Sequence, residues 1–85
     1  MPSHADLMRR ARITWLTTHP HTAEPTWSAT SVEMYEGRTY VVLRRGGEVI
    51  DIYRYKPATE NWRDTLKLLR YWPFPYPRNG GKRAA

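Results

Sequence analysis

The chain has 85 residues, of which 14 are basic and 8 acidic, and it contains no cysteine. That length fits one small domain, which buries only about 60–65% of the surface exposed by its unfolded chain. The lack of cysteine excludes disulfides and thiolate metal sites and favours a reducing cytoplasm. No apolar run approaches the roughly 18 residues of a membrane span, and the first residues lack the order of a secretion signal. We therefore expect a cytoplasmic protein with no membrane partner.

The first predicted element is a helix over residues 5–18. Ser3 and Asp6 have the spacing of a capping box, with Asp6 in place of the usual Glu or Gln. Pro20 disfavours helical continuation and so ends the helix. The apolar stripe of this helix, at helical spacing, consists of Met8, Ala11 and Trp15.

Three strands are predicted next, over residues 26–35, 38–45 and 48–56. Gly46-Gly47 predicts a two-residue hairpin, because the primed turns of such hairpins require a positive φ that glycine adopts readily. Glu36-Gly37 turns the chain between the first two strands. Links this short predict an antiparallel meander.

A second helix is predicted from Glu60 to about residue 71 or 72, after Pro57 stops the third strand and Thr59 supplies an N-cap. Pro73 ends it. Its predicted buried stripe consists of Trp62, Thr65, Leu66 and Leu69. The segment 73–77 alternates proline with aromatic residues, and it either folds back over the sheet edge or presents an aromatic-proline strip to a partner.

The predicted architecture is therefore α+β, with the order helix, three-stranded antiparallel meander, helix. Both helices are expected on one face of the sheet, which gives two layers. Residues 1–77 form the single predicted domain, and residues 78–85 form a mobile basic tail. Arg78, Lys82 and Arg83 give this tail +3 of the net charge of +6.

Alternate residues of the predicted strands differ in chemistry. One parity is aliphatic: Val32, Met34, Val41, Leu43, Ile50 and Ile52. The other carries four phenols and a guanidinium: Tyr35, Tyr40, Val42, Arg44, Tyr53 and Tyr55. Successive strand side chains point to opposite faces, so we expect helices on the aliphatic face and an open tyrosine face. Its candidate partner-binding residues are Tyr35, Tyr40, Arg44, Tyr53 and Tyr55; alternatively these residues only stabilise the sheet through cross-strand pairs.

A second candidate surface is a basic patch composed of Arg9, Arg10, Arg12, Lys67, Arg70, Arg78, Lys82 and Arg83. Contacts between such cations and phosphates would make binding steeply salt-dependent. The alternative is a solvated helix face followed by a solubilising tail.

Catalytic and metal-binding motifs are scarce. No Gly-x-Ser-x-Gly elbow is present, and no cysteine can act as a nucleophile. His4, His19 and His21 are the conceivable metal ligands, but a zinc site needs three or four well-placed ligands. Strand carboxylates are expected to pair with strand arginines, which is ordinary cross-strand charge pairing. We therefore expect a protein without enzymatic activity, cofactor or metal.

The order helix, three antiparallel strands, helix resembles that of double-stranded-RNA-binding domains. That family has a Gly-Pro-x-His-type loop and a lysine cluster where this chain has Glu36-Gly37 and Glu60-Asn61-Trp62-Arg63, so its RNA contacts do not carry over. The strings Tyr40-Val41-Val42-Leu43-Arg44 and Ile52-Tyr53-Arg54 resemble in style small accessory proteins of phages and plasmids, including anti-CRISPR and anti-restriction inhibitors. This resemblance implies a protein that docks on a host defence or nucleic-acid-handling complex. The alternative is direct binding of DNA or RNA by the tyrosine face, the basic helices and the tail.

Overall fold

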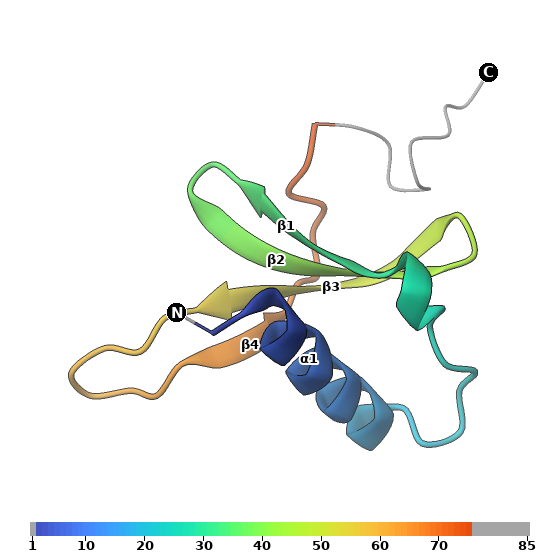
Figure 1. The fold of residues 1–85 in the computed structure, drawn as a ribbon, viewed down its shortest axis with the longest axis horizontal. Helices are drawn as coiled ribbons and strands as arrows, with labels where there is room; N and C mark the ends of the chain where they lie inside the picture. The colour runs from blue at the N-terminus through green and yellow to red at the C-terminus, as the bar shows by residue number, and fades with distance from the viewer. Residues whose placement is uncertain (1, 76–85) are drawn as a thin grey trace.

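The structure is a computed structural model that describes residues 2–75. A single helix precedes a four-stranded antiparallel sheet whose strands follow one another in sequence order (Figure 1). The elements are α1 (His4–Thr18), the short 3-10 helix η1 (Trp27–Ala29), β1 (Ser31–Tyr35), β2 (Arg38–Arg45), β3 (Glu48–Lys56) and β4 (Thr65–Leu68). The α+β class and the antiparallel meander are confirmed, but the sheet has four strands rather than three. The predicted tail, residues 78–85, lies outside the described residues.

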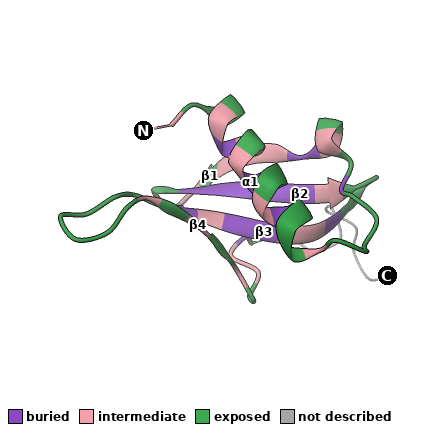
Figure 2. Cartoon of the chain, turned by 90° about the horizontal axis from the view of Figure 1, so that it is seen from below, coloured by how far each residue is buried: buried purple, intermediate pink, exposed green. Residues whose placement is uncertain are grey.

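Helix α1 forms close to its predicted bounds, because its start is encoded locally. The Oγ of Ser3 accepts a hydrogen bond from the backbone N–H of Asp6 at 3.1 Å, which is the expected N-cap. The helix lies across one face of the sheet (Figures 1 and 2). Its buried face consists of Leu7, Ala11 and Trp15. Within residues 2–75, no helix combines the length and the apolar composition needed to cross a membrane.

A β-bulge in β3 decides which side chains share a face of the sheet. Near the hairpin, Arg44 lies across from Val49, but the next residue of β2, Leu43, lies across from Asp51. Ile50 is therefore an extra residue in β3. A shift of one residue moves every following side chain to the other face.

The shifted register places polar and aromatic residues of β3 under α1. Tyr53 lies across from Val41, where a hairpin without a bulge would set it across from Tyr40. Asp51 also reaches the α1 face, and its Oδ2 accepts a hydrogen bond from Nε1 of Trp15 at 3.1 Å. The bulge therefore supplies the acceptor that a buried indole N–H requires.

Apolar clusters consequently form on both faces of the sheet. The cluster beneath α1 consists of Leu7, Ala11, Trp15, Val41, Leu43, Tyr53 and Tyr55. The cluster on the opposite face consists of Tyr40, Val42, Val49, Ile52 and Phe74. Buried residues accordingly run along β2 and β3 in Figure 2. The predicted division into a covered aliphatic face and an open tyrosine face is wrong, because tyrosines lie in both clusters.

The predicted second helix is also wrong, since residues 65–68 form β4 against β3. Leu66 lies across from Tyr55 and Thr65 across from Lys56. The pairing satisfies backbone groups that would otherwise form an open edge of β3. The alternation Leu66-Lys67-Leu68 fits a strand period of two, while the wider spacing of Trp62, Leu66 and Leu69 fits a helix. Pairing with the edge of β3 decided between them.

After β4 the chain crosses the sheet on the face opposite α1 (Figure 1). The backbone N–H of Leu69 donates to the carbonyl of Ile52 at 2.9 Å. The Phe74 ring then packs edge-on against Tyr40 and Tyr35, with centroid distances of 5.3 and 5.6 Å. Of the two predicted roles for segment 73–77, folding back is confirmed for Phe74, although it covers a face rather than an edge. Residues 76–77 lie outside the described residues.

Candidate functional site

The tyrosines predicted to form a binding surface lie inside the protein. Tyr53 and Tyr55 are 2% and 7% exposed beneath α1, and Tyr40 is 2% exposed beside Phe74. Tyr35 is half-buried against the same phenylalanine ring. The buried rings of Tyr40, Tyr53 and Tyr55 have no free face on which a base or a partner side chain could stack. The expectation of an open tyrosine surface is therefore corrected.

Arg44, the cation predicted within that surface, is bound by neighbouring parts of the chain. One terminal nitrogen lies 2.8 Å from Oε2 of Glu33. The other donates to Oγ of Ser31 at 2.9 Å and to the carbonyl of Ala29 at 3.1 Å. These bonds tie β2 to β1 and η1, so the side chain has a structural role.

The predicted basic patch is divided between partnered and free cations. Arg9 forms an ion pair with Asp6 one turn earlier in α1. Arg12 lies 3.9 Å from Glu24 and 5.6 Å from the centroid of the Trp27 ring. Lys67 and Arg70 are exposed in β4 and after it, and the remaining three predicted members, Arg78, Lys82 and Arg83, lie outside the described residues.

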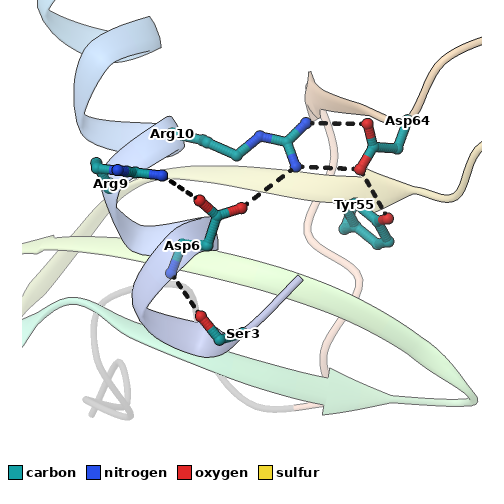
Figure 3. A network of polar contacts seen from close by, with 6 residues as sticks. All are labelled: Ser3, Asp6, Arg9, Arg10, Tyr55 and Asp64. Atoms are coloured by element: carbon teal, nitrogen blue, oxygen red, sulfur yellow. Dashed lines mark hydrogen bonds and ion pairs between the residues drawn. The ribbon is translucent and has the colours of Figure 1, made fainter. Parts of the chain in front are cut away.

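Arg10 belongs to a polar network that joins α1, β3 and the loop before β4 (Figure 3). Its two terminal nitrogens donate to the two carboxylate oxygens of Asp64 at 3.1 and 3.2 Å. The hydroxyl of Tyr55 donates to Asp64 at 3.0 Å, and Asp6 lies 3.7 Å from Arg10. The bonds from Arg10 and then from Tyr55 hold the pKa of Asp64 below its ordinary value. Burial, and then the bond to Asp64, raise the pKa of Tyr55.

The strand register gathers a different set of cations on the face opposite α1. Arg54 lies between Tyr40 of β2 and Lys67 of β4. Side chains two residues apart in a strand lie on the same face of the sheet. Lys56 therefore lies on the face of Arg54, and Arg38 lies on the face of Tyr40. We refer to Arg38, Arg54, Lys56 and Lys67 together as the basic sheet end.

The basic sheet end differs from the arginines of α1 in having no internal partner. Among residues 2–75, none of its four side chains forms an ion pair or a hydrogen bond, and the buried Nε of Arg54 has no acceptor. Arg54 and Lys67 lie directly opposite each other, and like charges so placed destabilise a sheet. Of the acidic residues close in sequence, Asp51 accepts a bond from Trp15 and Asp64 accepts bonds from Arg10, while Glu36 and Glu60 are exposed in the adjoining turn and loop. Nothing in the part of the chain that the structure describes neutralises this positive charge.

Two hollows adjoin at this end of the sheet. One, of about 580 Å³, lies between the β1–β2 turn and the end of β3, and its lining includes Arg38 and Arg54. The other, of about 750 Å³, lies within the β3–β4 loop, and Pro57 lines both. The residues of the loop hollow that carry functional groups are Lys56, Thr59, Asn61, Trp62, Arg63, Asp64 and Thr65. Trp62 is 77% exposed, so its predicted burial in a helical stripe is wrong.

Sequence reasoning missed this site for identifiable reasons. Arg38 and Arg54 were expected to pair with strand carboxylates, and Trp62 was placed in a helix that does not form. The alternation Arg54-x-Lys56 does indicate that both side chains share one face of a strand. Which face that is depends on the bulge at Ile50, and the position of Lys67 beside them depends on β4.

The histidines do not assemble into a metal site in the described part of the chain. His19 stacks on Trp15 with a centroid distance of 4.3 Å. No group of three or more His, Asp or Glu side chains within residues 2–75 is placed to hold a metal ion.

Comparison of the chain with protein-family models, with curated proteins and with solved structures found no match. The observed order of one helix and four strands also differs from the helix, three strands and helix on which the resemblance to double-stranded-RNA-binding domains rested.

Proposed function

We propose that this protein is a non-enzymatic nucleic-acid-binding protein whose basic sheet end contacts the phosphate backbone. The observation that supports this most directly is the set of four cations that have no carboxylate partner within residues 2–75. They project from three adjacent strands on one face. Neighbouring strands lie about 5 Å apart and alternate residues about 7 Å apart, so one polyanion contacts several of them together.

The expected affinity is strongly electrostatic. Each phosphate contact releases condensed counterions, so log K falls with log salt by about 0.9 per contact for duplex DNA and about 0.7 for a single strand. Four contacts therefore predict a slope of about −2.8 for a single strand and about −3.6 for duplex DNA. The formal net charge of +6 adds long-range attraction for a polyanion.

The test is an anisotropy titration of a labelled oligonucleotide between about 50 and 200 mM salt. The double variant Arg54→Gln with Lys67→Gln removes two unpartnered cations and should make the salt slope about 1.4 to 1.8 units shallower. Its matched control, Arg9→Gln with Arg12→Gln, removes the same charge from α1, where both arginines have carboxylate neighbours. Equal effects of the two double variants, or no binding at the lowest salt, would contradict the proposal.

A second candidate function is docking on a host defence or nucleic-acid-handling complex, as an anti-CRISPR-like inhibitor would. It is supported by Trp62 and Tyr71, two aromatic side chains that remain exposed. Tryptophan, tyrosine and arginine are the types enriched at interface hot spots. A pull-down from lysate with and without nuclease distinguishes the two functions. A protein partner retained after nuclease treatment supports docking, whereas recovery that disappears supports direct nucleic-acid binding.

A further inference from the structure

The loop between β3 and β4 combines an exposed aromatic ring with a hollow. Residues 57–64 extend beyond the end of the sheet, as Figure 1 shows, and residues 57–63 are exposed, as Figure 2 shows. Trp62 belongs to neither of the two apolar clusters of the described residues. In so small a domain, a tryptophan left in water is a side chain that the fold does not use.

The loop is nevertheless tied to the body of the protein. At its far end, Asp64 accepts two bonds from Arg10 and one from Tyr55 (Figure 3). Within the loop, the backbone N–H of Thr59 donates to the carbonyl of Trp62 at 2.8 Å. The Trp62 ring is thus carried by an anchored turn, which lowers the conformational entropy lost when a ligand stacks on it.

The chemistry of the hollow matches a nucleotide. The Trp62 indole offers a flat surface for a base, and the Asn61 amide both donates and accepts hydrogen bonds, as a base edge requires. Lys56 and Arg63 offer positive charge for the phosphate. A volume of about 750 Å³ falls within the roughly 300–1,000 Å³ of small-ligand sites.

The two hollows together suit a continuous strand. The hollow lined by Arg38 and Arg54 also reaches Tyr55 of the α1 face, and it shares Pro57 with the loop hollow. Phosphates held by Arg38 and Arg54 at this end of the sheet would therefore lie next to the hollow of Trp62. A duplex keeps its bases stacked on one another, which denies Trp62 a free base face. A single strand leaves its bases free to stack on aromatic side chains.

We infer that the β3–β4 loop holds an unpaired nucleobase against Trp62 and makes the protein selective for single-stranded nucleic acid. This inference rests on the proposed function, since the basic sheet end supplies the phosphate contacts. Trp62 adds the preference for strands whose bases are accessible.

The experiment measures affinity for a labelled single strand of about twelve nucleotides and for the matching duplex, by anisotropy at low salt. Trp62→Ala should weaken single-strand binding by roughly 5- to 150-fold, the effect of losing one stacked base, and leave duplex binding unchanged. Trp62→Phe should retain most of the single-strand affinity, because an aromatic face remains. Tyr71→Ala is the control, as it removes another exposed ring outside the loop.

A second readout follows the Trp62 ring itself. Single-strand binding should quench tryptophan fluorescence in the wild type, and the quench should disappear in Trp62→Phe. Circular dichroism establishes that each variant is folded.

The outcomes separate the two proposals. If Trp62→Ala leaves single-strand affinity unchanged while the Arg54 and Lys67 double variant weakens binding, base stacking is overturned and the proposed function stands. Equal losses for single strand and duplex would likewise overturn base stacking. No binding of any oligonucleotide by the wild type overturns the proposed function and the inference with it.

Discussion

The two faces of the sheet differ in how completely the chain covers and neutralises them. On the α1 face, the helix packs over the central strands, and Arg10 is matched by the two carboxylates Asp6 and Asp64. On the opposite face, the cover is the segment after β4 with Phe74. At the end of that face, Arg54 and Lys67 lie next to each other without a carboxylate partner among residues 2–75.

This difference separates cations that support the fold from cations that are available for binding. Arg10 connects α1 to the β3–β4 loop, so its charge is used internally. The positive charge of Arg54 is repelled by that of Lys67, and no carboxylate among residues 2–75 pairs with it. Residue type does not distinguish the two arginines; position relative to acids does.

Inserting one alanine between Ile52 and Tyr53 tests the origin of the two faces and should have the largest effect. A second extra residue in β3 shifts the strand beyond it by one, which would expel Tyr53 and Tyr55 from beneath α1. At about 3–5 kcal/mol for each buried aromatic ring, that loss is comparable with the roughly 5–15 kcal/mol that stabilises a small domain. We expect an unfolded chain by circular dichroism.

The matched control is deletion of Ile50, which removes the bulge but leaves every other residue of β3 across from its present partner, and it should remain folded. An insertion variant with a cooperative melting transition like that of the wild type would show that the strand register does not decide which side chains α1 covers.

Phe74→Ala tests the cover of the face opposite α1. Phe74 is 7% exposed and contacts the rings of Tyr35, Tyr40 and Trp72. Truncating a buried phenylalanine lowers the free energy of unfolding by about 3–5 kcal/mol. Urea denaturation measures this, with Ile13→Ala as the control because Ile13 is exposed on α1. A change in Phe74→Ala no larger than in the control would mean that this segment does not cover the sheet.

The smallest effect is a difference in pH dependence between Arg10→Gln and Arg54→Gln. Arg10 is the main cause of the lowered pKa of Asp64. The stabilisation from that pair is therefore present above the ordinary Asp pKa of 3.8 and is lost as pH falls below it towards the folded value. Arg10→Gln should melt at a lower temperature than wild type at neutral pH. Its melting temperature should also fall less than that of the wild type as the pH is lowered.

Arg54→Gln removes the same charge from a site without a carboxylate partner. It should retain the acid profile of the wild type and should melt no lower at neutral pH, since it relieves repulsion from Lys67. Melting curves between about pH 2.5 and 7 provide the comparison. Identical profiles for the two variants would refute the distinction between paired and free arginines.

The sequence by itself determined the elements whose signals are local. The Ser3 cap and the apolar stripe of α1 act within one or two turns, and Gly46-Gly47 closes a hairpin between adjacent strands, so α1, β2 and β3 form as predicted. Tertiary structure decided the rest. The bulge at Ile50 set which side chains share a face, and the free edge of β3 drew residues 65–68 into β4. Both outcomes depend on pairing between different elements of the sheet, and that pairing fixes whether an arginine lies beside a carboxylate or beside another cation.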